Sequence, residues 1–171
     1  PPRPKVPMRV VIAPDKFKGT LTAQQAADAM ASAVRERWAG AEIVVLPMAD
    51  GGDGTLDALG GPTRRDTVTG PLGLPVAVAW RLDGDSAVIE SAAASGLVLA
   101  GGAQGNDPWG ATSRGVGEVL ALALDAGATR IVVGMGGSAM TYGGRGALDA
   151  LGARVPFPPG VIVLTDAIIG F

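Results

Sequence analysis

The sequence predicts an α/β protein built on a mostly parallel β-sheet whose faces are covered by helices. Short β-branched runs, such as MRVVIAP (8–14) and AEIVVLP (41–47), are typical of buried strands. Segments with apolar residues at helical spacing alternate with these runs, which is the pattern of βα units. At 171 residues and 47% hydrophobic, the chain is long and apolar enough to bury a substantial core.

The N-terminal elements form a βαβ unit. After the strand at 8–14, Thr22 and Gln25 match a capping box, and apolar residues then recur at helical spacing up to Trp38. The second strand, at 41–47, follows this helix. A helical crossover between neighbouring strands predicts that they pair in parallel.

The remaining elements follow in order along the chain. We expect a short helix ending at Leu59, a weak strand at 64–70, a hairpin of strands 75–82 and 86–91 that turns at Asp83–Gly84, a helix at 115–126, a buried strand at 128–138 that runs into glycines, a short helix at 146–153 and a strand at 160–167. The predicted organisation is a disordered leader (1–7), an N-terminal βαβ segment (8–69) and a second α/β segment (70–171).

Composition excludes several classes of function. The net charge of −2, with scattered Lys and Arg, gives no electrostatic footprint for nucleic acid or an anionic membrane surface. No apolar run reaches the roughly 18 residues of a membrane span, and PPRPKVP lacks the apolar segment of a signal peptide, so we expect a cytoplasmic protein. Without cysteine or histidine, thiolate metal sites and a histidine general base are excluded.

Ligands of parallel sheets collect at the carboxyl ends of the strands, and three loops there carry unusual residues. The first is PDKFKGT (14–20), in which Lys16 and Lys18 flank Phe17 ahead of a helix. Two ammonium groups beside helix-start amides can clamp a phosphate, or both can be solvated surface charges.

The second loop, ADGGDGT (49–55), places Asp50 and Asp53 among glycines. Gly and Asp are default turn residues, so a solvated turn is one interpretation. The other is a cation site, because Mg²⁺ commonly takes one or two carboxylates and completes its shell with water and substrate phosphate.

The third loop, GMGGSAMTYGG (134–144), contains a partial match to the GxGxxA dinucleotide fingerprint. The required acid about 20 residues on is missing, because Arg154 and Val155 stand there, so a nicotinamide site is poorly supported. There is no GxxxxGK[ST] P-loop either. An amide nest with the Ser138 hydroxyl, serving a phosphate, fits better.

Other polar residues near these loops have two interpretations each. Thr112 and Ser113 can contact an anion or, as we favour, cap a helix. Glu90, Ser91 and Ser95 follow the hairpin and can line a pocket or serve a structural role.

Six stretches together resemble one family. VIAPDKFKGTLTAQQAADAM, LPMADGGDGTLDAL, VTGPLGLPV, VIESAAASGL, NDPWGATSRGVGEVL and DAGATRIVVGMGGSA are similar, in order and wording, to the bacterial glycerate kinases of type 1, over roughly residues 8 to 155. The resemblance implies Rossmann- or flavodoxin-like topology with a second α/β lobe, incomplete here because family members are more than twice as long. It also implies ATP-dependent phosphorylation of D-glycerate, usually to 2-phosphoglycerate, with Mg²⁺.

The resemblance also assigns roles to residues. It implies catalytic Asp50, Asp53 and Lys16, with Asp50 or Asp53 holding Mg²⁺ and the other orienting or deprotonating the glycerate hydroxyl. The implied substrate- and phosphate-binding residues are Asp15, Lys18, Gly51, Gly52, Gly54, Thr55, Gly136, Gly137 and Ser138. The expected partners are D-glycerate and ATP, with a homodimer left open.

Position 142 departs from the family pattern. The family carries Asp before the GG pair, whereas this chain has Tyr142, a phenol that is neutral near pH 7. The alternative function is therefore a catalytically impaired relative that binds a nucleotide or small anion.

Overall fold

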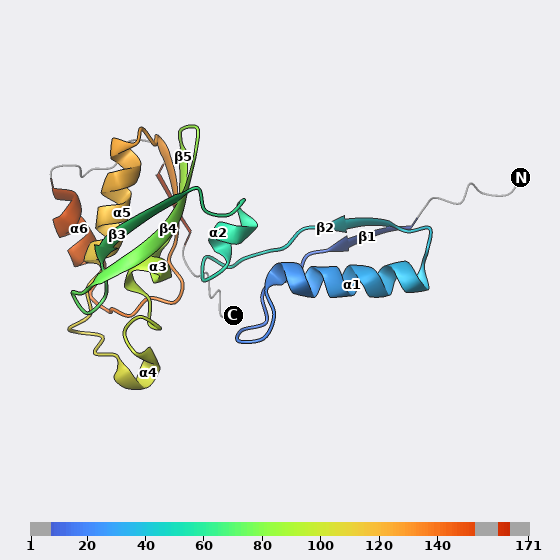
Figure 1. Cartoon of the computed structure of the whole chain (residues 1–171), viewed down its shortest axis with the longest axis horizontal. Helices are drawn as coiled ribbons and strands as arrows, with labels where there is room; N and C mark the ends of the chain where they lie inside the picture. The colour runs from blue at the N-terminus through green and yellow to red at the C-terminus, as the bar shows by residue number, and fades with distance from the viewer. Residues whose placement is uncertain (1–7, 153–160, 165–171) are drawn as a thin grey trace, which may run out of the picture. The chain divides into compact units, whose positions relative to one another are not determined.

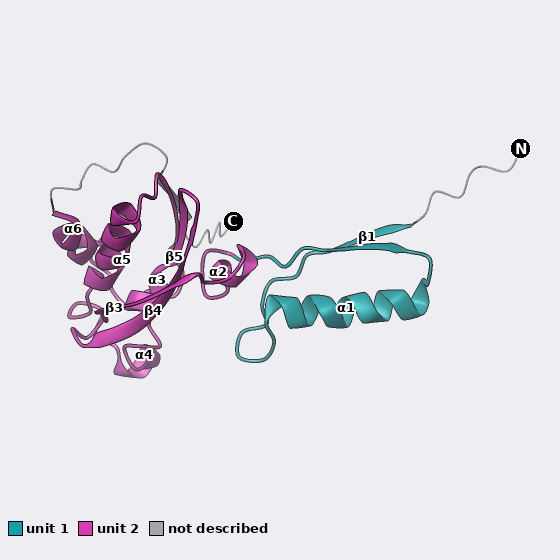
Figure 2. Ribbon diagram, turned by 45° about the horizontal axis from the view of Figure 1, so that its top comes forward, with its two compact units in different colours: residues 1–49 teal, residues 50–171 magenta. Residues whose placement is uncertain are grey.

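The computed structural model describes residues 8–152 and the backbone of residues 161–164. The chain divides into two compact units, residues 1–49 and 50–171, coloured separately in Figure 2. Each unit is described by itself. The predicted leader at 1–7 lies outside the described residues.

The first unit is the βαβ unit that the sequence predicts. Strands β1 (Arg9–Ile12) and β2 (Glu42–Val45) pair in parallel, and helix α1 (Ala23–Arg37) connects them (Figure 1). Both bonds of the capping box are present: Gln25 N–H donates to Thr22 Oγ1 at 3.1 Å, and Thr22 N–H donates to Gln25 Oε1 at 2.9 Å. Buried Ile12, Ala27 and Ala31 form the core between α1 and the strands.

The second unit contains a mixed five-stranded sheet in the order β3-β4-β5-β6-β7. Strands β3 (Arg64–Thr69), β4 (Pro75–Asp83) and β5 (Ser86–Glu90) pair antiparallel, while β5, β6 (Arg130–Gly134) and β7 (Val161–Leu164) pair in parallel. The parallel part brings the carboxyl ends of β5 and β6 together, with Glu90 opposite Gly134. Loops that follow these two strands therefore begin side by side.

Helices pack against this sheet. Helix α5 (Arg114–Asp125) contacts β3, β5 and the neighbouring helices α3 (Ser91–Ser95) and α6 (Arg145–Leu151). The core joins alternate residues of the strands to the apolar face of α5, including fully buried Ile89, Ile131 and Val119. Two four-residue helices complete the unit: α2 (Thr55–Ala58), which contacts β5, and α4 (Gly102–Gly105).

The α/β class is confirmed, and the structure refines its details. The two compact units divide between residues 49 and 50, and the strand at 64–69 pairs with β4 within the second unit. Asp83 still belongs to the strand, where it pairs with Ser86, so the turn of the hairpin begins at Gly84 and not at Asp83. Gly84 has a φ of +58°. Helices α3 and α4 were not predicted from the sequence. Within the described residues, no helix is both long and apolar enough to cross a membrane.

Candidate active site

The acidic glycine loop at 50–55 is held in shape by its own side chains. The Asp50 carboxylate accepts the Gly52 N–H at 3.0 Å, and the Thr55 hydroxyl donates to Gly52 O at 2.6 Å. Gly51 and Gly54 have φ angles of +91° and +96°, which favour glycine. The loop therefore turns sharply into α2 and leaves Asp53 exposed to solvent.

This loop packs against the glycine loop that follows β6. The Gly136 N–H donates to Gly51 O at 3.0 Å, so the two main chains are directly bonded. A Cβ at Gly134 would lie 2.5 Å from Gly51 O, and one at Gly136 would lie 2.6 Å from Gly52 Cα. Two segments more than 80 residues apart in sequence thus approach so closely that only glycine fits at positions 134 and 136.

The rest of the glycine loop is fixed by the segment that follows β5. Ser138 Oγ lies 3.1 Å from Ser91 Oγ and donates to Met135 O at 3.0 Å. Gly137 O accepts the Leu97 N–H at 2.8 Å. Gly137 itself has a φ of +73°, as expected for a tight turn.

These contacts divide the predicted phosphate-binding residues into two groups. The Gly136 amide is bonded to Gly51 O, so in this structure it serves the contact between the loops. Gly137 and Ser138 follow it at the turn, and their main-chain amides are the ones we expect to meet an anion.

Glu90 is a site residue whose role the sequence left open. This side chain is only 8% exposed at the end of β5, and its Oε1 accepts the Leu56 N–H at 2.6 Å. Burial raises the pKa of the Glu90 carboxyl above its usual value of 4.5; the charges of Asp53 and Asp57 act in the same direction, and the main-chain hydrogen bonds oppose them. A carboxylate that ends an apolar strand, in SAVIES, is the signal in the sequence.

The lysine loop belongs to the first unit and is described there alone. Phe17 and Leu21 exchange main-chain hydrogen bonds across a turn that contains Lys18 and Gly19. Lys16 Nζ lies 4.0 Å from Asp15 Oδ1, and the Lys16 side chain is only 14% exposed, whereas the Lys18 side chain is exposed. The roles predicted for Asp15, Lys16 and Lys18 remain predictions.

Tyr142 belongs to the segment before α6, and its side chain reaches the start of α5. Its hydroxyl accepts the Ser113 N–H at 3.1 Å and donates to Thr112 Oγ1 at 3.1 Å. Burial opposes ionisation of the phenol, but these hydrogen bonds outweigh it and lower the pKa of Tyr142. The phenol thus stabilises a helix terminus, and Thr112 caps the same helix by accepting the Arg114 N–H at 3.1 Å.

The sequence favours Ser113 as a helix cap, but its side chain does not cap α5. Its hydroxyl instead accepts the Ala147 N–H at 3.0 Å and so connects α5 to α6. The predicted role fails because a partner more than 30 residues away in sequence captures the hydroxyl.

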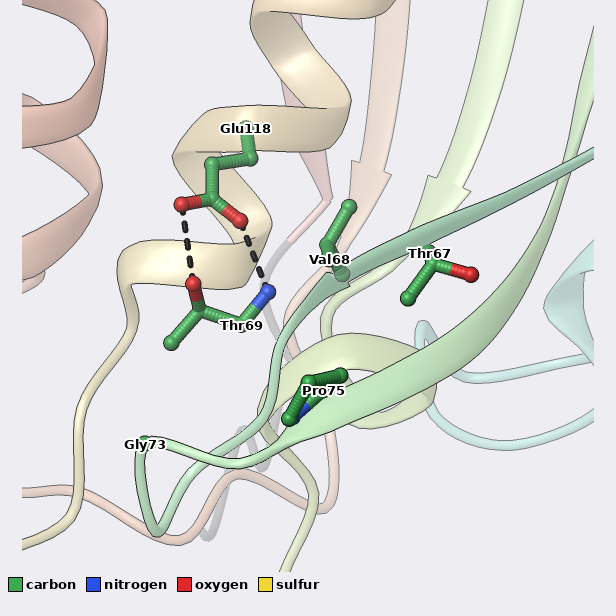
Figure 3. Close-up of a pocket in the computed structure, with 6 residues that line it drawn as sticks. All are labelled: Thr67, Val68, Thr69, Gly73, Pro75 and Glu118. Carbon is green, nitrogen blue, oxygen red and sulfur yellow. Dashed lines mark hydrogen bonds between the residues drawn. The ribbon is translucent and has the colours of Figure 1, made fainter.

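A shallow pocket of about 230 Å³ lies elsewhere on the second unit, between β3, the β3–β4 turn and α5 (Figure 3). Its lining contains none of the predicted site residues. The Glu118 carboxylate there accepts the N–H and the hydroxyl of Thr69 at 2.7 and 2.9 Å (Figure 3). Burial opposes ionisation of Glu118, but the Thr69 and Arg114 hydrogen bonds lower its pKa overall, as expected of a structural carboxylate.

The donors at the acidic loop suit a hard divalent cation. Asp50 and Asp53 offer carboxylate oxygens, and Mg²⁺ needs only one or two of these when substrate phosphate and water complete its shell. Among the described residues there is no group of three or more acidic, histidine or cysteine side chains placed to bind a metal. The residues therefore fit a magnesium ion shared with a phosphate, not a cation enclosed by protein ligands.

These features define an α/β protein in which an acidic loop and a glycine loop meet at the carboxyl ends of the parallel strands β5 and β6. Comparison with known proteins is more specific. Residues 10–159 match the model of the glycerate kinase family, and the chain belongs to that family.

Comparison with individual relatives supports the same family. The chain is 47% identical over 154 residues to glycerate 2-kinase of Escherichia coli K12 and to glycerate kinase of Bacillus subtilis 168, covering 86% of this chain and 40% of each relative. It is also similar to the crystal structure of a protein provisionally assigned as glycerate kinase 2 from Salmonella typhimurium LT2, with a TM-score of 0.73, 44% identity and coverage of 86% and 41%. The chain thus spans about two fifths of the length of these relatives.

Proposed function

We propose that the protein phosphorylates D-glycerate with ATP, forming a phosphoglycerate, with 2-phosphoglycerate as the expected product. The contact between Gly136 N–H and Gly51 O carries this proposal, because it brings an acidic loop and an amide-rich turn to one site. Phosphoryl transfer asks mainly for positioning and for stabilisation of negative charge, and these groups supply both. Membership of the glycerate kinase family favours this enzyme over the binding module.

In this mechanism the Gly137 and Ser138 amides bind phosphate oxygens. The roles of Lys16 and Lys18, which belong to the first unit, rest on the resemblance to the family alone, which implies that they neutralise phosphate charge. Asp50 or Asp53 would hold magnesium, which would supply positive charge at the transferred phosphoryl group. The carboxylate that is not engaged by the cation orients the glycerate hydroxyl or accepts its proton. Such roles need neither histidine nor cysteine, in agreement with the composition.

Coupled ADP release with D-glycerate, ATP and Mg²⁺ tests the proposal on the intact protein. We expect Asp50→Asn to lower kcat by about 100-fold or more, since it removes a charge that acts in the transition state. Asp149→Asn is the control, because Asp149 lies on α6 in an exposed pair with Arg145. Wild-type activity in Asp50→Asn, or no ADP release by the wild-type protein, would overturn the assignment.

The product is decided by ³¹P and ¹H NMR of the reaction mixture. Phosphorus coupled to the single proton on C2 identifies 2-phosphoglycerate, whereas coupling to the two C3 protons identifies the 3-isomer. Gel filtration tests the homodimer and cell fractionation tests the cytoplasmic location, both of which stay predictions.

A further inference from the structure

Glu90 and Ser91 are adjacent residues that contact the two different loops of the site. Glu90 Oε1 accepts the Leu56 N–H at 2.6 Å, directly after the acidic loop. Ser91 Oγ lies 3.1 Å from Ser138 Oγ in the glycine loop. The end of β5 is therefore a shared anchor for both loops.

The alternation of β5 explains which side of the sheet Glu90 faces. Ala87 and Ile89 belong to the main core with α5, so Val88 and Glu90 point to the opposite face. Helix α2 contacts β5 and contributes buried Leu56. Glu90 thus meets the first turn of α2, directly after the acidic loop.

An ionised carboxylate is energetically unfavourable at this buried position. A buried carboxylate beside Asp53 and Asp57 destabilises the folded state in its ionised form, as its raised pKa indicates. Its hydrogen bond to Leu56 offsets part of this effect. A residue chosen for stability alone would be apolar or neutral, so the side chain points to a role in the site.

We propose that Glu90 is a positioning residue of the phosphoryl-transfer site, whose reach to the Leu56 N–H holds the acidic loop against the glycine loop. This inference rests on the proposed function for its kinetic consequence, but its structural consequence stands apart. Glu90 acts through the main chain of residues 54–56, not by touching substrate. Loss of its hydrogen bond should loosen the contact between Gly51 and Gly136.

The test compares three substitutions of Glu90 in the intact protein. Glu90→Gln keeps the length and an oxygen acceptor but removes the charge, Glu90→Asp keeps the charge but shortens the reach, and Glu90→Ala removes both. Glu118→Ala is the matched control, because Glu118 also accepts a main-chain N–H at the end of a strand, that of Thr69, away from both loops. Steady-state kinetics and amide hydrogen exchange are measured for each.

We expect Glu90→Gln to lower kcat least, Glu90→Asp to lower it more and Glu90→Ala to lower it most, by about 100-fold. Small displacements of reacting groups have effects of this size. KM for ATP should change less than kcat. Exchange of the Leu56 amide should accelerate by about tenfold or more in Glu90→Ala, as expected for loss of a hydrogen bond to a charged acceptor. Exchange of the Gly136 amide, whose acceptor is Gly51 O, should also accelerate, because the contact between the two loops loosens. Glu118→Ala should leave kcat and both amides within twofold of wild type.

Two results would overturn the inference. If Glu90→Asp retains more activity than Glu90→Gln, charge and not reach is what matters. If exchange at Gly136 is unchanged in Glu90→Ala, or in Glu90→Asp should the alanine variant not fold, the anchor does not join the loops. A wild-type protein without kinase activity would refute the proposed function alone, because the exchange data still decide the positioning role.

Discussion

Replacing Gly136 with alanine should separate the two loops of the site. The added Cβ would lie 2.6 Å from Gly52 Cα and 2.9 Å from Gly52 N, closer than such atoms can approach. Because both neighbours are main-chain atoms, no side-chain rotation relieves the contact. The acidic loop must move, and the hydrogen bond from Gly136 N–H to Gly51 O is strained or lost.

The expected loss of stability follows from this overlap. Overpacking by one carbon typically costs 1–3 kcal/mol, and a contact with rigid main chain places Gly136→Ala in the upper part, about 2–3 kcal/mol. For a unit of this size, that corresponds to a lower Tm by about 8–12 °C. The proposed kinase reaction should slow by more than the stability change explains, because the loops that form the proposed site are displaced.

Thermal and urea unfolding, followed by circular dichroism, measure this effect. Gly105→Ala is the control in the same unit, since the nearest atom to its added Cβ is Ala100 O at 3.4 Å and its φ is not positive. We expect Gly105→Ala to change stability by less than about 0.5 kcal/mol. Equal stability and activity of the two variants would refute the close approach of residues 51–52 and 134–136.

Two further predictions concern side chains outside the loops. Tyr142 is the sole tyrosine in the sequence, so an ultraviolet pH titration reports its ionisation directly, and we expect a midpoint below 10. The Tyr142→Phe variant should lose about 1 kcal/mol of stability, because it loses the two hydrogen bonds at the start of α5. A midpoint at or above 10 would contradict those hydrogen bonds. The pKa of Glu118 is lowered in the folded protein, so its contribution to stability is present above its unfolded pKa of 4.5 and is lost as the pH falls through its folded pKa. In urea unfolding measured from pH 7 to pH 3, the free energy of unfolding should therefore fall less steeply on the acid side for Glu118→Gln than for wild type. Identical pH dependences would show that the carboxylate contributes nothing.

The sequence predicts local structure best where the signal lies within a few residues. Thr22 and Gln25 identify the start of α1, and both of their hydrogen bonds form. The hairpin after residue 75 is predicted by its alternation and by Gly84. Helix α3 has no such signal, because SAAAS directly follows a strand and is stabilised by its packing against α5 and β4.

The site could be predicted in its parts but not in its connections. The glycines at 134 and 136 indicate either an anion nest or a close approach of main chains, and sequence does not separate these, because both need a missing Cβ. The structure assigns Gly136 to the close approach through its bond to Gly51. The sequence does not decide the role of Glu90 for a similar reason, since its partner Leu56 is 34 residues away.

The departure at Tyr142 is better understood with the structure. From the sequence it is a missing carboxylate, whereas in the fold its hydroxyl bonds Ser113 and Thr112 at a helix start. Asp50, Asp53 and Glu90 supply carboxylates at the loop contact independently of it. This separation is why we expect the Tyr142→Phe variant to retain the proposed kinase activity.

Amide hydrogen exchange of the intact protein with and without Mg²⁺ and ATP tests the central claim most directly. That claim is that the acidic loop and the glycine loop bind one triphosphate together. The account predicts that amides within 50–56 and within 136–139 slow in parallel as ATP is added, with the same concentration dependence. Slowing of one loop alone, or of neither while ATP binds elsewhere, would contradict it.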